Sequence, residues 1–99
     1  MAINITRVAT ERIGPGAHGM VVAVHIESED LPERAIPLMV KIGNVTARGV
    51  GALGIKPGVR AVFSEMPAVG ATLLIGYLDE PLEETRFKFV APESNQTLL

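Results

Sequence analysis

Short runs of apolar residues, rich in valine, isoleucine and leucine, alternate along this chain with polar or glycine-rich stretches. In several runs every second residue is apolar, which is the period of a β-strand with one buried face. The runs that predict strands are residues 3–8, 20–27, 36–42, 45–50, 59–64, 71–78 and 85–90. Nowhere do apolar residues recur at helical spacing over a convincing length. The pattern therefore predicts an all-β protein with about seven strands.

The alternation also predicts which side chains face the core. Val22, Val24 and Ile26 share one face of the run 20–27. The run 71–78 is nearly continuous in apolar residues, which suits a central strand buried on both faces. In the other alternating runs the inward positions are Val59, Ala61, Phe63, Phe87 and Phe89.

The turn signals between the runs indicate how the strands are arranged. Gly43 and Asn44 connect the runs 36–42 and 45–50 with the chemistry of a tight two-residue hairpin turn. Turn signals recur about every 8 to 12 residues, which is the pattern of an immunoglobulin-like β-sandwich. A chain of 99 residues makes one domain. We expect a single antiparallel immunoglobulin-like β-sandwich over residues 1–91, followed by a polar C-terminal tail over residues 92–99.

Several motifs resemble the IPT/TIG family of immunoglobulin-like (E-set) domains. The opening INITRVATERIGPGAHGMVVAVHI is similar to a first strand, a glycine-rich turn and a second strand of that family. LMVKIGNVTARGV looks like its central hairpin. VFSEMPAVGATLLIGY followed by RFKFV is similar to its proline-glycine turn, long strand and closing aromatic strand. The resemblance covers nearly the whole chain and implies an immunoglobulin-like fold.

The glycine-rich stretch GPGAHGMV, residues 14–21, fits two phosphate-loop patterns, those of dinucleotide-binding proteins and of protein kinases. A dinucleotide loop opens a helix, whereas the valine-rich residues after Gly19 favour a strand. The kinase interpretation fails because 99 residues leave no room for a catalytic lobe and neither H-R-D nor D-F-G occurs. We therefore interpret Gly14, Pro15, Gly16 and Gly19 as turn residues between two strands.

Composition excludes several classes of partner and site. The chain has no cysteine, hence no disulfide framework and no thiolate zinc site, and we expect no cofactor. Its net charge is −2, and its sequence lacks the stripe of basic residues that a nucleic-acid-binding surface needs. No apolar run approaches the ~20 residues of a membrane span, so we expect no membrane insertion. Localisation is cytoplasmic if Met1 is native, and extracellular if the domain is excised from a longer protein.

Catalytic chemistry finds little support. The three serines, Ser28, Ser64 and Ser94, lack a nucleophile-elbow context, and neither histidine is placed to suggest a triad. His18 and His25 lie apart, in a turn and in a strand, so they are interpreted as surface histidines rather than as ligands of one metal ion. We expect the protein not to be an enzyme.

The placement of acidic residues is more informative. In a sandwich whose successive loops alternate between its two ends, the loop after the second strand and the loop before the last strand lie at the same end. These two loops carry eight of the eleven acids, which we call the acidic pole: Glu27, Glu29, Asp30, Glu33, Asp79, Glu80, Glu83 and Glu84. Carboxylates gathered in this way could hold calcium or meet a basic partner, or they could form a solvated surface that keeps the domain soluble.

Three functions follow from these features. The favoured hypothesis is a non-catalytic immunoglobulin-like recognition module for a protein, and less favourably for a glycan, because Tyr77 alone is a candidate for stacking on a sugar. The alternative is a structural subunit of an assembly such as a virion or surface layer, in which Leu98 and Leu99 of the tail join copies of the chain. An enzyme is the third and is disfavoured.

Overall fold

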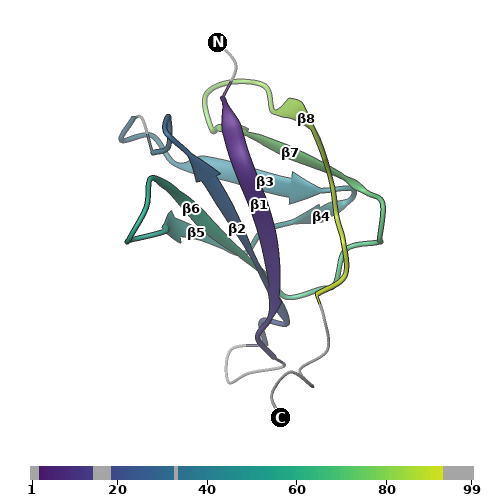
Figure 1. Cartoon of the computed structure of the whole chain (residues 1–99). Coiled ribbons are helices and arrows are strands. Elements are labelled where there is room, and N and C mark those ends of the chain that lie inside the picture. Colours follow the sequence, from purple (N-terminus) through teal and green to yellow (C-terminus); the bar gives the residue numbers. More distant parts are fainter. Residues whose placement is uncertain (1–2, 15–18, 33, 93–99) are drawn as a thin grey trace.

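The computed structural model describes residues 3–14, 19–32 and 34–92. These residues form eight strands and no helix (Figure 1). The strands are β1 (Ile5–Arg12), β2 (Val22–Ser28), β3 (Leu38–Ile42), β4 (Val45–Thr46), β5 (Gly49–Ala52), β6 (Gly58–Phe63), β7 (Thr72–Tyr77) and β8 (Glu83–Lys88). The all-β prediction is confirmed. No helix among the described residues is long and apolar enough to cross a membrane.

The strands form two antiparallel sheets of four strands each, consistent with a β-sandwich. One sheet has the order β1-β2-β6-β5 and the other the order β4-β3-β7-β8. The strand β7 is central, between β3 and β8, as its nearly continuous apolar sequence predicts. Connections repeatedly cross from one sheet to the other, so the chain does not follow a simple up-and-down path. Strands that pair within a sheet are antiparallel, and hydrogen bonds join the loops after β2, β5 and β7 at one end of the sandwich.

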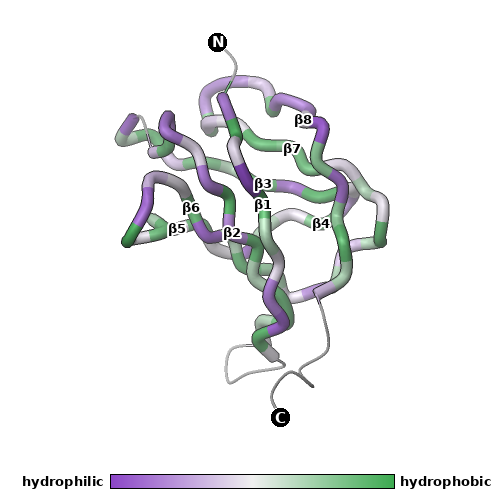
Figure 2. The backbone as a smooth tube through the Cα atoms, viewed as in Figure 1, coloured by the Kyte–Doolittle hydropathy of each residue, from purple (hydrophilic) through white to green (hydrophobic). Residues whose placement is uncertain are grey.

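The core lies between the two sheets and is built mainly from aliphatic side chains, with Phe63, Tyr77 and Phe89 as its aromatic members. Val22, Val24 and Ile26 of β2 are each at most 1% exposed, which confirms the predicted inward face of that strand. Phe63 of β6 and Ile75 of β7 belong to different sheets, and both are fully buried. Figure 2 shows the alternation of hydrophobic and hydrophilic residues along the strands that produces this core.

The run 45–50, predicted as one strand, is two strands in different sheets. The hairpin at Gly43 and Asn44 is present, but β4 ends after two residues at Thr46. The Ala47 N–H then donates to the carbonyl of Val40 in one sheet, while the next N–H, that of Arg48, donates to Val62 in the other sheet. The chain thus changes sheets between successive residues, which is why the described strands number eight rather than seven.

The glycine-rich stretch leads from one antiparallel strand to the next. β1 ends at Arg12 and β2 begins at Val22, and the Ile13 N–H donates to the Val21 carbonyl, so the two strands are drawn together before the turn. Gly19 has a φ of +79°, a conformation that favours glycine. Residues 15–18 lie outside the described residues. The strand that follows Gly19 agrees with the turn interpretation and leaves no helix N-terminus to face a pyrophosphate.

Candidate functional site

The two loops of the acidic pole lie at the same end of the sandwich, at the top of Figure 1. The Leu78 N–H, at the start of the β7–β8 loop, donates to the carbonyl of Pro37 at the end of the β2–β3 loop. The β5–β6 loop joins them, because its Pro57 carbonyl accepts from the Ser28 N–H. Glu33 lies outside the described residues, whereas the other seven acids of the pole are described.

Arg34 connects the two loops. It belongs to the β2–β3 loop, and its guanidinium lies 2.9 Å from an Oε of Glu80 and 3.9 Å from an Oδ of Asp79, both in the β7–β8 loop. The same guanidinium lies over the ring of Tyr77, 4.0 Å from the ring centroid. A cation between an aromatic face and a carboxylate combines cation–π attraction with a charge-assisted hydrogen bond.

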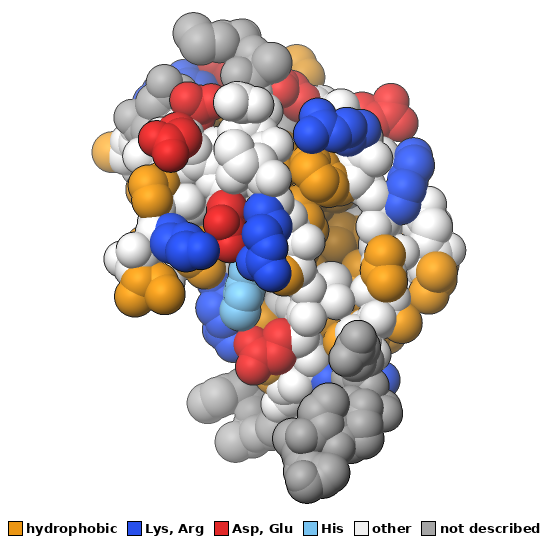
Figure 3. Space-filling view, viewed as in Figure 1, with side chains coloured by type: hydrophobic (Ala, Val, Ile, Leu, Met, Phe, Trp, Pro, Cys, Tyr) orange, Lys and Arg blue, Asp and Glu red, His pale blue; other side chains and the backbone are white. Residues whose placement is uncertain are grey.

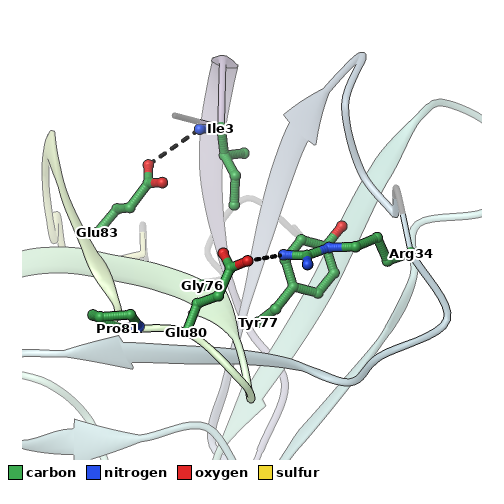
Figure 4. A pocket seen from close by; sticks show the side chains of 7 residues that line it. All are labelled: Ile3, Arg34, Gly76, Tyr77, Glu80, Pro81 and Glu83. Atoms are coloured by element: carbon green, nitrogen blue, oxygen red, sulfur yellow. Dashed lines mark hydrogen bonds and ion pairs between the residues drawn. The ribbon is translucent and has the colours of Figure 1, made fainter. Parts of the chain in front are cut away.

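A pocket of ≈ 370 Å³ opens beside this arrangement (Figure 4). We call it the Arg34–Tyr77 pocket, and its lining residues are Ile3, Arg34, Gly76, Tyr77, Glu80, Pro81 and Glu83. The β7–β8 loop can fold over β7 here because residue 76 is glycine: a Cβ at this position would lie 3.0 Å from the Pro81 carbonyl oxygen. The pocket thus combines an aromatic wall, two carboxylates and one guanidinium.

The guanidinium of Arg34 remains charged. Its pKa is raised above its usual value, mainly by the hydrogen bond to Glu80 and further by the negative charges of Glu80 and Asp79. Arginine is already protonated at every physiological pH, so the raised pKa does not change its charge. It indicates that the surrounding groups stabilise a cation.

Several other acids of the pole are engaged by neighbouring groups. Glu27 lies 3.0 Å from the guanidinium of Arg7 and 3.7 Å from the ammonium of Lys56. Asp30 accepts a hydrogen bond from the Asn4 N–H, and Glu83 accepts one from the Ile3 N–H. Figure 3 shows acidic and basic side chains close together on this face. Among the described residues no group of three or more histidine or acidic side chains could hold a metal ion, so the calcium hypothesis gains no support.

Ser28 fixes the N-terminal segment to the pole. Its side chain is buried, its Oγ donates to the Asn4 carbonyl over 2.7 Å, and it accepts from the Asp30 N–H over 3.0 Å. The same residue donates its backbone N–H to Pro57. Three separate chain segments therefore depend on one small polar residue at the end of β2.

We expect Ser28→Ala to lower the free energy of unfolding by about 1 to 3 kcal/mol, because the carbonyl of Asn4 and the N–H of Asp30 lose their partner in a partly buried site. Urea denaturation at equilibrium measures the change. Thr6→Ala is the matched control, since Thr6 Oγ1 donates to the Glu27 carbonyl at an exposed position and its loss is expected to cost under about 0.5 kcal/mol. Equal losses for the two variants would contradict the role given to Ser28.

His25 is half-buried on the outer face of β2, and His18 lies outside the described residues. The Nε2 of His25 is 3.4 Å from a carboxylate oxygen of Glu11 in β1 and has no hydrogen-bond partner among the described atoms. His25 thus lies beside a carboxylate of the neighbouring strand, with its side chain partly exposed. The structure brings no second histidine and no serine hydroxyl into an arrangement with it among the described residues, so catalytic chemistry gains no support here.

Comparison of this chain with protein-family models, with curated proteins and with solved structures found no match.

Sequence reasoning found the acids but missed the pocket that they border. Tyr77, the candidate for stacking on a sugar, is only 2% exposed. The guanidinium of Arg34 lies over the Tyr77 ring. The sequence signal that could have indicated this pocket was Arg34, a basic residue four residues after Asp30 in an otherwise acidic loop. The predicted assembly residues Leu98 and Leu99 lie outside the described residues.

Proposed function

We propose that this protein is a non-catalytic immunoglobulin-like recognition module that binds a basic segment of a protein partner at the acidic pole. The order of strands supports the immunoglobulin-like assignment. With β1, β2, β6 and β5 in one sheet, and β3, β7 and β8 in the other beside the short β4, the arrangement agrees with the ABED and CFG sheets of that fold. The IPT/TIG resemblance of the sequence is in keeping with this order, and membership of that family is part of the proposal.

The Arg34–Tyr77 pocket is the observation that supports the proposal most directly. Arg34 is a cation that the chain itself places against an aromatic ring and a carboxylate, and these are the groups that would receive an arginine or lysine of a partner. The pocket continues beside Arg34 along Glu83 and Pro81, so a second cationic side chain can lie next to the first and contact Glu83.

Charge at the same end favours a basic partner. The described acids of the acidic pole number seven, and the cations in contact with them are Arg7, Arg34 and Lys56. Glu29 and Glu84 are exposed at its margin. An excess of negative charge around a pocket attracts a positively charged segment and excludes acidic ones, and its effect is strongest on the rate of association at low salt.

The test is titration of the labelled protein with a short arginine-containing peptide, with NMR shifts mapped onto the sequence. We expect the largest shifts at Arg34, Gly76 and Glu80, and the Glu80→Gln/Glu83→Gln double variant is expected to bind about tenfold more weakly, because two rim charges and their hydrogen bonds are worth about 1.4 kcal/mol together. Glu65→Gln is the matched control, because Glu65 is exposed in the β6–β7 loop at the opposite end of the sandwich. Equal weakening by Glu65→Gln, or shifts spread evenly over the surface, would refute a site at the pole.

A further inference from the structure

The strand β1 is an exposed edge of the sheet β1-β2-β6-β5 (Figure 1). It is the longest strand among the described residues, and every residue of it except Ile5 is at least partly exposed. It pairs with β2 on one side, and the described part of the chain places no strand on its other side. A long edge strand of this kind presents a row of unpaired backbone groups to another strand.

The pairing of β1 with β2 shows which backbone groups point outward. The Ile13 N–H donates to the Val21 carbonyl just beyond the strand, and the register continues from this pair without irregularity as far as Arg7. Because hydrogen-bonded pairs alternate along an antiparallel ladder, Arg7, Ala9 and Glu11 bond to β2. The N–H and C=O groups of the residues between them point away from β2, namely those of Val8, Thr10 and Arg12.

The charges of β1 are complementary to those of a second copy of the same strand. Arg7 and Glu11 each lie two residues from Ala9, and all three share the outer face of the sheet. An antiparallel pair with its two-fold axis at Ala9 therefore sets Arg7 of each copy opposite Glu11 of the other. The side chains of Arg7 and Glu11 are 63% and 55% exposed, so both can make this contact.

Other registers of the same pair lose this match. An axis at Arg7 or at Glu11 sets like charges opposite each other, which is unfavourable. An axis at Val8 or at Thr10 sets neither charge opposite its counterpart. Charge thus selects the axis at Ala9 among the two-fold registers of β1.

The uncharged positions of β1 fit the same register. Val8 of one copy lies opposite Thr10 of the other, and these are residues whose backbone groups point outward, so the two strands can exchange hydrogen bonds there. The side chains of Val8 and Thr10 line a recess of ≈ 180 Å³ between β1 and β8 on the inner face. Ala9 meets its own copy in a pair without hydrogen bonds, where Cα atoms approach to about 4.5 Å and a small side chain fits well.

The edge strand β8 of the other sheet is less suited to pairing. Its register with β7 is irregular between Thr72 and Leu74, and the Leu73 carbonyl accepts a hydrogen bond from the Thr85 side chain. Irregularities of this kind disrupt the row of backbone groups that a second strand needs. From Arg7 to Arg12, β1 has no such interruption.

We propose that two copies of this chain associate by antiparallel pairing of their β1 strands about a two-fold axis at Ala9. The pair joins two four-stranded sheets edge to edge. Arg7 keeps its contact with Glu27, since that contact uses one of the five N–H donors of the guanidinium. A single pair of strands makes an interface below about 1,200 Å², so we expect a reversible dimer. The paired residues do not line the Arg34–Tyr77 pocket, so the proposal is independent of binding at the acidic pole.

Sedimentation velocity of the full chain between about 10 μM and 1 mM tests the proposal through a charge swap. We expect the parent chain to form a dimer, and Arg7→Glu or Glu11→Arg alone to weaken it at least about tenfold, because each variant turns two symmetry-related attractions into repulsions. The double variant Arg7→Glu/Glu11→Arg is expected to restore the dimer to within about threefold of the parent. Within one chain the swap restores neither the Arg7–Glu27 nor the Glu11–His25 contact, so recovery reports the contact between copies.

Three results of this experiment would overturn the proposal. The first is a parent chain that stays monomeric at about 1 mM. The second is a double variant that associates as weakly as the single ones, since the opposite charges would then not face each other. The third is growth beyond the dimer, which a closed two-fold pair does not allow.

A disulfide at the axis gives a separate readout, because the chain has no cysteine. In the proposed pair the two copies of Ala9 lie within the Cα separation that a disulfide spans. We expect Ala9→Cys to form a disulfide-linked dimer under mild oxidation, read on a non-reducing gel. Ala52→Cys is the matched control, because Ala52 is an exposed alanine of β5, the other edge of the same sheet. Equally fast dimer formation by the control, or none by Ala9→Cys, would refute the axis at Ala9.

Discussion

Replacing Gly58 with alanine is expected to lower the free energy of unfolding by about 3 kcal/mol or more, because this position excludes a side chain for two separate reasons. Gly58 is the first residue of β6 and has a φ of +148°, which side chains of L-residues rarely adopt. A Cβ at this position would also collide with the carbonyl oxygen of Ile26 in β2. Since β2 and β6 are the two central strands of their sheet, they would have to separate to admit a methyl group.

The matched control for this variant is Gly51→Ala, in the neighbouring strand β5. Gly51 has nothing within 4 Å of the position of an added Cβ and does not have a positive φ. We expect its free energy of unfolding to stay within about 0.5 kcal/mol of the parent value. Equilibrium urea denaturation of both variants measures the difference. A Gly58→Ala protein as stable as the Gly51→Ala protein would contradict the close approach of β2 and β6.

Phe63→Ala is expected to have the second large effect, a loss of about 3 to 5 kcal/mol. Phe63 is fully buried in a core that is mainly aliphatic, with Tyr77 and Phe89 as the other aromatic members among the described residues. A domain near 100 residues has a free energy of unfolding of about 5 to 10 kcal/mol, and this change removes a large share of it.

Ile55→Ala is the comparison for Phe63→Ala, because it also removes a large apolar side chain. Ile55 lies in the β5–β6 loop and is 91% exposed, so its truncation is expected to change the free energy of unfolding by under about 0.5 kcal/mol. Thermal denaturation followed by far-ultraviolet circular dichroism distinguishes the two. Similar melting temperatures for both variants would show that the core is not organised around Phe63.

Periodicity predicted most of the fold because a sandwich buries every second residue of its strands. The runs 20–27, 59–64 and 71–78 become β2, β6 and β7 with boundaries shifted by one or two residues. The run 45–50 was predicted wrongly as one strand, since hydrophobic periodicity reports that residues are buried but not in which sheet. The change of sheet at Ala47 and Arg48 depends on hydrogen bonds to Val40 and Val62, which are distant in sequence.

The candidate site was predicted only as a region. Counting strands places the acids of two loops at one end, and the structure brings these loops together. Which acid faces which cation depends on loop conformations that leave no periodic signal, so the contact of Arg34 with Glu80 and Tyr77 could not be read from the sequence. The same reason hid the recess between β1 and β8: Val24, Phe87 and Phe89 of its lining were predicted to face the core, and only the spacing of two edge strands shows that this core has an opening.

The unequal lengths of the edge strands limit how copies of this molecule can polymerise. On one side of the sandwich the edges are β4 and β5, of two and four residues. Edges this short offer few free backbone groups to a neighbouring chain. Strand pairing between copies is therefore expected at β1 and β8, the longer edges, one in each sheet. Pairing of β1 with β1 would complete a two-fold symmetric pair, whereas pairing of β1 with β8 would leave one edge of each copy open to the next.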